Sequence, residues 1–98
     1  MTSLHIALED GFADDTVVLF VNDDEVFRKD GVTTRTQISL ADSFELNVPA
    51  GPVRLRVDVP SQGVGETLEV DASEHPFVGL SVRDGGIRVR FPEQLGYL

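Results

Sequence analysis

Apolar and polar residues alternate in segment after segment of this chain, and this pattern limits the fold more than any other feature. In residues 53–57, Val-Arg-Leu-Arg-Val, every second residue is apolar. Successive side chains of a β-strand point to opposite faces of the sheet, so a period of two is typical of a strand with one buried face. No segment has a sustained helical period. The sequence therefore predicts a protein built from strands.

The alternation divides into eight or nine short strands. Clusters of glycine, proline, asparagine and aspartate separate them, which is typical of an antiparallel sandwich or small barrel. The expected strands cover residues 3–9, 16–22, 25–28, 32–40, 43–48, 53–59, 66–71, 77–83 and 86–91. We predict an all-β fold, an antiparallel Ig-like or prealbumin-like β-sandwich. One helical turn is expected after Phe91, where Pro92 can begin a helix that includes Glu93 and Gln94.

The last hairpin can be predicted to its register. A two-residue turn at Asp84-Gly85 keeps all apolar residues on one face and sets Ser81 opposite Arg88. A turn one residue later would set Arg83 opposite Arg88, and facing like charges are destabilising. The residues expected to lie deepest in the core are Leu19, Leu46, Leu55, Leu80 and Val89.

The length and composition of the chain indicate one globular domain over residues 1–98. With 41% hydrophobic residues, the chain can form one modest core. Its 17 acidic and 8 basic residues give a formal net charge of −9. Bulk electrostatics therefore oppose binding to nucleic acid and to anionic membranes, and we expect neither as a partner.

Several kinds of site are excluded by residues that the sequence lacks. The chain has no cysteine, which removes disulfides, thiolate metal sites and thiol catalysis. Its longest uninterrupted apolar run, residues 17–21, is far shorter than the ~20 residues of a membrane-spanning helix. Residues 1–10 lack the basic start and long apolar stretch of a secretory signal. We therefore expect a cytoplasmic location.

The middle of the chain resembles a class of small sandwich domains. Residues 44–53 read Phe-Glu-Leu-Asn-Val-Pro-Ala-Gly-Pro-Val, so an apolar strand ends in Pro-x-Gly and the next strand alternates outward. This resembles the prealbumin-like sandwiches, namely the carboxypeptidase regulatory-like and PEGA modules. The resemblance covers less than half of the chain. It implies a sandwich fold and a non-catalytic, adhesive or accessory role, and it carries over no functional residues.

Histidine suits acid–base catalysis near neutral pH, and the chain has two. His5 is expected to project outward from its strand, and His75 lies in the turn before Pro76. Neither has a recognisable catalytic context. A Gly-x-Ser-x-Gly elbow, a phosphate-binding glycine loop and a zinc-ligand spacing are also absent from the sequence. We predict no enzyme activity, no catalytic residues and no cofactor.

Loop aspartates suggest a metal site, because calcium prefers hard oxygen ligands. If the chain reverses direction at every connection, alternate loops share one end of the sandwich, and the two ends lie about 20 Å apart. The group at one end, the alternative calcium site, is Asp10, Asp14, Asp15 and Asp30, and the group at the other end is Asp23, Asp24, Asp42 and Asp84. Neither group has EF-hand spacing, and aspartate is also a common turn residue.

Outward-facing arginines suggest a contact surface. Aromatic residues and arginine are both enriched at protein interfaces. The predicted binding surface consists of Phe77, Arg54, Arg56, Arg83, Arg88 and Arg90. An alternative is a solvated face on which these arginines pair across strands with Asp58, Glu69 and Asp71. The expected partner is an acidic protein, either another chain or the aspartate-rich half of a second copy in a homo-oligomer.

The function that we favour is a non-catalytic protein-interaction or accessory module, which includes self-association. A calcium- or carbohydrate-binding domain is the main alternative, and an acidic inhibitor that mimics nucleic acid is a third. Mimicry requires acidic residues massed on one face, whereas here they lie mostly in loops. A calcium titration would separate the first two functions, and light scattering would test self-association.

Overall fold

Most of the alternating segments form strands in the computed structural model, which describes residues 2–38 and 40–92. Within this part of the chain the strands are β1 (Thr2–Leu8), β2 (Asp15–Val21), β3 (Asp24–Val32), β4 (Asp42–Val48), β5 (Pro52–Val59), β6 (Val64–Asp71), β7 (Phe77–Arg83) and β8 (Gly86–Arg90). A short 3₁₀ helix, η1 (Pro60–Gln62), joins β5 to β6. In the described residues, no helix has the length and apolar character needed to cross a membrane.

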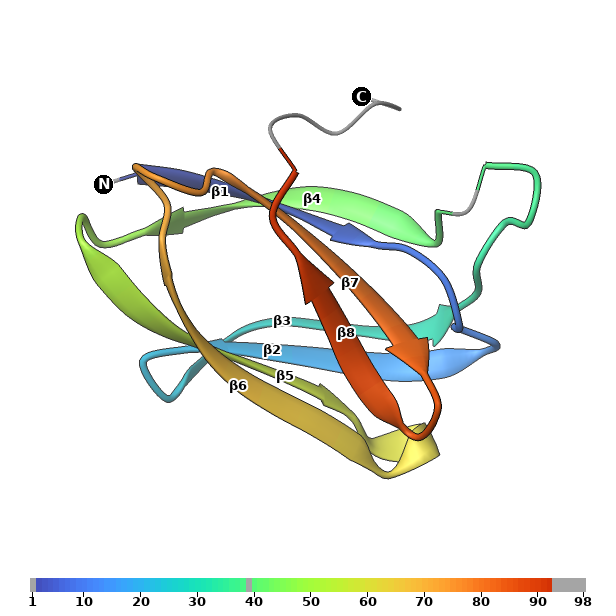
Figure 1. Cartoon of the computed structure of the whole chain (residues 1–98). Coiled ribbons are helices and arrows are strands. Elements are labelled where there is room, and N and C mark those ends of the chain that lie inside the picture. Colours follow the sequence, from blue (N-terminus) through green and yellow to red (C-terminus); the bar gives the residue numbers. More distant parts are fainter. Residues whose placement is uncertain (1, 39, 93–98) are drawn as a thin grey trace.

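The strands form two four-stranded sheets that pack face to face (Figure 1). The first sheet has the order β4-β1-β7-β8, and the second has the order β3-β2-β5-β6. Neighbouring strands are antiparallel except β1 and β7, which run parallel with His5 opposite Phe77. The predicted all-β antiparallel sandwich is therefore confirmed. Its edge strands are β4 and β8 in the first sheet and β3 and β6 in the second.

The core lies between the sheets and consists of the inward-facing residues of each strand. Of the residues predicted to lie deepest, Leu19, Leu55 and Leu80 are fully buried. Leu46 and Val89 are only partly buried, so the prediction was wrong for these two. Both lie on edge strands, where one side has no neighbouring strand to cover the side chain. Edge strands also contribute deeply buried residues, such as Val48 and Val70, so depth in the core depends on the place along a strand as well as on the strand.

The turn between β7 and β8 forms at Asp84-Gly85, which confirms the prediction. These residues have φ angles of 54° and 74°, and two consecutive positive φ values are typical of the type I′ turn that closes a two-residue hairpin. The register sets Ser81 opposite Arg88 and Arg83 opposite Gly86. The two arginines therefore do not face each other directly.

Residues 24–32 form one strand, whereas the sequence predicted strands at 25–28 and 32–40 with a turn between them. Gly31 has a φ of 68°, and the register with β2 shifts between Asp15 and Val17. Two residues of β3 oppose one residue of β2 there, which is a β-bulge with glycine in the left-handed region. The chain therefore continues through Gly31 without reversing, and residues 33–41 connect β3 to β4.

This bulge changes which loops share an end of the sandwich. Asp42 lies opposite Leu8 at the end of β1, and Asp84 follows β7, whose last residue forms an ion pair with Asp10. Asp42 and Asp84 thus lie at the same end as Asp10. Their predicted grouping with Asp23 at the other end was wrong, because it counted one reversal too many.

The chain leaves the alternating pattern after Arg90, where β8 ends. Phe91 falls within the predicted strand 86–91, but it lies beyond the end of β8 and is exposed. The predicted helical turn involves Glu93 and Gln94, which lie outside the described residues.

Candidate binding groove

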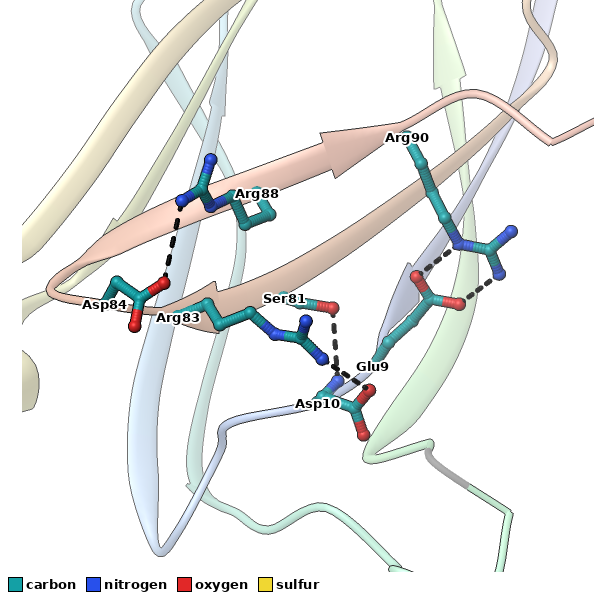
Figure 2. Close-up of a pocket in the computed structure, with 7 residues that line it drawn as sticks. All are labelled: Glu9, Asp10, Ser81, Arg83, Asp84, Arg88 and Arg90. Atoms are coloured by element: carbon teal, nitrogen blue, oxygen red, sulfur yellow. Dashed lines mark hydrogen bonds and ion pairs between the residues drawn. The ribbon is translucent and has the colours of Figure 1, made fainter.

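A groove of about 540 Å³ lies on the outer face of the first sheet, close to the turn between β7 and β8 (Figure 2). Three arginines, three acidic residues and one serine line it. These residues, the arginine groove, are Arg83, Arg88, Arg90, Glu9, Asp10, Asp84 and Ser81. Its formal charges cancel, in a protein with a net charge of −9. The groove is therefore much less negative than the protein as a whole.

Glu9 and Arg90 form an ion pair across Gly79. Nε of Arg90 donates to Oε1 of Glu9 at 2.8 Å, and Nη2 donates to Oε2. A Cβ atom at Gly79 would collide with Oε1 of Glu9 and lie 2.9 Å from Cγ of Arg90. The Glu9 side chain is only 8% exposed, and a bidentate arginine compensates the charge of a buried carboxylate. This pair therefore forms a fixed wall of the groove.

Arg83 and Arg88 are held much more loosely. Nη2 of Arg83 lies 3.9 Å from Oδ2 of Asp10, and Nη2 of Arg88 lies 3.7 Å from Oδ2 of Asp84. A charge-assisted hydrogen bond is about 2.8 Å long. Neither guanidinium donates a hydrogen bond to another residue of the described ranges, and both side chains are about two-thirds exposed, at 65% and 66%. Their donors are therefore accessible to a ligand.

The predicted binding surface is divided between the two sheets. Arg54 and Arg56 lie on β5 in the second sheet, whereas Phe77 and the other three arginines lie on β7 and β8 in the first. The six residues point outward on opposite sides of the sandwich, so the prediction of one surface was wrong. Arg54 pairs with Asp23 at 3.1 Å, and Arg56 pairs with Asp58 at 3.1 Å. Asp58 is one of the partners that the alternative named, but it lies on β5 together with Arg56, so this pair forms along one strand and not across strands.

Phe77 and the histidines do not line the groove. The rings of His5 and Phe77 lie 5.0 Å apart, and Nδ1 of His5 lies 3.6 Å from Glu45. His75 is exposed, as expected, and its ring lies 4.8 Å from that of Phe91. His5 is half-buried, although the sequence predicted a surface position. Both histidine rings therefore pack against a phenylalanine ring outside the groove.

The aspartates of the predicted calcium site do not converge. Within residues 2–38 and 40–92, no group of three or more histidine, cysteine, aspartate or glutamate residues is placed to hold a metal ion. Asp10 lines the groove, and Asp30 accepts a hydrogen bond from the hydroxyl of Thr16 at 2.8 Å. The prediction for Asp10, Asp14, Asp15 and Asp30 was therefore wrong.

Asp15 is buried and has a structural role. Its carboxylate accepts hydrogen bonds from the Ser61 hydroxyl at 2.6 Å, from Nε2 of Gln62 at 2.7 Å and from the Ala13 N–H at 2.8 Å. Burial raises the pKa of Asp15, but these hydrogen bonds together outweigh burial and hold its pKa below the ordinary value. Asp15 therefore attaches η1 to the start of β2 as an anion.

The binding surface predicted from the sequence did not include the groove residues Glu9, Asp10, Ser81 and Asp84. One signal was present in the sequence. Gly79 interrupts an apolar strand, and a glycine in a strand often marks the close approach of another group. Here that group is the ion pair of Glu9 and Arg90. The sequence does not reveal the partner strand, because β1 and β7 lie far apart along the chain.

Comparison with known proteins found no match: no family model matches the chain, and neither a curated protein nor a solved structure does. The function is therefore inferred from the geometry of the groove.

Proposed function

We propose that this chain is a non-catalytic protein-binding module whose arginine groove binds a carboxylate-bearing segment of a partner protein. The loose contacts of Arg83 and Arg88 carry this proposal. Both guanidinium groups line the groove, and their ion pairs are longer than hydrogen bonds. Arginine presents five donors in a planar fork that matches a carboxylate. An aspartate or glutamate of a partner can therefore fill donors that the described residues leave open.

Two of the three acidic residues of the groove, Asp10 and Asp84, can be displaced at little cost in free energy. The side chains of Asp10 and Asp84 are 44% and 80% exposed. Exposed ion pairs contribute only about 0–1 kcal/mol to stability. A partner carboxylate that accepts two charge-assisted hydrogen bonds would replace a weak contact with a stronger one. Asp10 and Asp84 would then return to solvent.

We also propose that the fold is prealbumin-like rather than Ig-like. In an Ig sandwich the first two strands share a sheet, and the third strand pairs with the sixth. Here β1 and β2 lie in different sheets, and β3 pairs with β2. The Pro-Ala-Gly turn at residues 49–51 and the outward alternation of β5 support the resemblance. An adhesive or accessory role agrees with the binding proposal, and the cytoplasmic location stays a prediction.

Titration of isotope-labelled protein with the peptide Gly-Glu-Gly-Glu-Gly, followed by nuclear magnetic resonance, tests the binding site. We expect saturable shifts of the Nε–H signals of Arg83 and Arg88 but not of Arg54 and Arg56. The double variant Arg83→Gln/Arg88→Gln should bind at least about tenfold more weakly, because hydrogen bonds to charged groups contribute about 1.5–3 kcal/mol each.

The matched control is Arg54→Gln/Arg56→Gln, which removes the same charge from the opposite sheet. Its affinity should stay within about twofold of wild type, because distant sites act independently. An equal loss of affinity in both double variants would mean that only net charge matters, and it would overturn the assignment of the groove.

Sedimentation of the protein alone tests whether the partner is a second copy. In that case a dimer should form, and Arg83→Gln/Arg88→Gln should dissociate it.

A further inference from the structure

β8 is an edge strand, and no strand of the described residues pairs with its outer side. In a hairpin with a two-residue turn, the pair next to the turn is hydrogen-bonded, and so is every second pair after it. These pairs include Arg83 with Gly86 and Ser81 with Arg88. The N–H and C=O groups of Ile87 and Val89 therefore point away from β7 toward the open edge.

The side chains of this edge alternate between charged and apolar. Arg88 lies on the outer face beside the groove, while Ile87 and Val89 face inward. Val89 is only partly buried, as are Val64 and Leu68 on β6, which lies close to β8. The edge thus combines free backbone groups and a guanidinium with an incompletely covered apolar strip.

We propose that β8 binds an extended segment of the partner by antiparallel strand addition, and that this segment carries acidic residues at alternate positions. This inference rests on the proposed function, because the same arginines bind the partner's carboxylates. Strand addition supplies affinity through main-chain hydrogen bonds, here with Ile87 and Val89, and specificity through alternate side chains. The acidic residues lie over the arginines, and the residues between them face the apolar strip.

The register explains where the acidic residues would lie. The residue opposite Arg88 belongs to a non-hydrogen-bonded pair, in which side chains are closest, so a glutamate there meets the guanidinium of Arg88. The next outward residue lies opposite Gly86. Because Gly86 has no side chain, a glutamate opposite it can reach across toward Arg83, which is the cross-strand neighbour of Gly86. Two acidic residues separated by one apolar residue therefore match the two loosely held arginines.

The charges of the edge favour an acidic strand over a second β8. Pairing β8 with its own copy would bring arginines close to arginines, and like charges across strands are destabilising. Charged side chains on a short edge strand are a common protection against self-pairing. We therefore assign the edge to a separate acidic segment.

Calorimetric titration with the peptide Val-Glu-Val-Glu-Val and two N-methylated forms tests strand addition. In the proposed complex the valine amides point to β8 and the glutamate amides point away. N-methylation of the valine amides should therefore weaken binding at least about tenfold, because each lost hydrogen bond contributes about 0.5–1.5 kcal/mol and the methyl groups also block the approach. N-methylation of the glutamate amides should leave the dissociation constant within about threefold.

These changes are made in the peptide, so the protein stays folded throughout. Equal binding of both N-methylated forms, together with a loss in Arg83→Gln/Arg88→Gln, would overturn strand addition and leave the proposed function intact. Unchanged binding in Arg83→Gln/Arg88→Gln would overturn the proposed function itself. A dimer that forms without peptide and dissociates on addition of Val-Glu-Val-Glu-Val would show that a second copy occupies β8, which contradicts the assignment to a separate partner.

Discussion

The arginines of the two outer faces come from the same alternating pattern but have different surroundings. On the second sheet, Arg54 and Arg56 each contact a carboxylate at 3.1 Å, and Arg56 also lies over the ring of Phe20 at 5.4 Å from its centre. On the first sheet, Arg83 and Arg88 lie 3.7 Å or more from their acidic neighbours. The arginines of the second sheet are therefore paired within the protein, whereas the guanidinium groups of Arg83 and Arg88 have N–H donors that can bind a ligand.

The difference follows from the carboxylates that lie within reach of each arginine. β5 is a central strand, and β2 and β6 flank it on both sides. Arg88 lies on the edge strand β8, and Arg83 ends β7 beyond the last residue that pairs with β1, Leu80. Arg54 reaches Asp23 in the turn after β2, whereas Arg56 pairs with Asp58 of its own strand and lies over Phe20 of β2. On the edge strand β8, Arg90 is held because Glu9 reaches it across Gly79, whereas no carboxylate of the described residues lies within hydrogen-bond distance of Arg88.

The largest effect that we expect contrasts a central and an edge position in the core. Leu55→Ala should lower the free energy of unfolding by about 2–5 kcal/mol through lost burial and a cavity. Leu46→Ala should cost less than about 2 kcal/mol, because part of its side chain already contacts solvent. Urea denaturation measures both. Equal losses would contradict the view that edge strands are incompletely covered.

Two glycines extend the comparison to the outer faces. Gly79→Ala should cost about 1–3 kcal/mol, because the new methyl group collides with the Glu9–Arg90 pair. On β6, a Cβ atom at Gly65 would lie 2.6 Å from Oδ1 of Asp58, the end of a side chain that can rotate away. Gly65→Ala should therefore change stability by less than about 1 kcal/mol. Thermal unfolding measures both variants. If Gly65→Ala lost more stability than Gly79→Ala, the Glu9–Arg90 pair would not be a fixed wall of the groove.

The buried carboxylate of the second sheet should make stability depend on pH. The pKa of Asp15 is lowered in the folded state, so its contribution is present above the unfolded pKa of about 3.9 and is lost as pH falls through the folded pKa. Asp15→Asn should be less stable than wild type at neutral pH. The difference between their free energies of unfolding should become smaller toward about pH 3. Asp10→Asn, an exposed groove residue, is the control and should change little at neutral pH. Urea denaturation at several pH values measures this difference. A difference that stays constant with pH would argue against the role of Asp15 as an anion.

The smallest expected effects concern the arginines themselves. Arg54→Gln/Arg56→Gln should lower the free energy of unfolding by up to about 1 kcal/mol, because close but exposed ion pairs are lost. Arg83→Gln/Arg88→Gln should change it by less than about 0.5 kcal/mol, since their contacts are loose. Chemical denaturation of both variants makes the comparison. If Arg83→Gln/Arg88→Gln lost more stability than Arg54→Gln/Arg56→Gln, Arg83 and Arg88 would contribute to the stability of the fold.

Local features were predictable from the sequence, and features that depend on distant pairing were not. The alternation identified most of the strands, and the charges of Arg83 and Arg88 were sufficient to choose the turn at Asp84-Gly85. The sequence Asp30-Gly31 suits a turn and a bulge equally well, and only the pairing of β3 with β2 decides between them. Alternation also shows that Arg54 points outward but not from which sheet. The groove needs Glu9 beside β7, a contact that no local pattern contains.

The parallel pairing of β1 with β7 has a consequence for how the protein folds. His5 lies opposite Phe77, so the first strand of the chain reaches this neighbour only after a very long loop has closed. The entropy of closing that loop is lost before the contact is gained, and all-β domains of such high contact order typically fold in milliseconds to seconds. During synthesis on the ribosome, β1 emerges before the other described strands, and one of its edges stays unpaired until β7 has been made. Over that interval the nascent chain has an unpaired strand on which the first sheet is later completed, and it is then most exposed to aggregation.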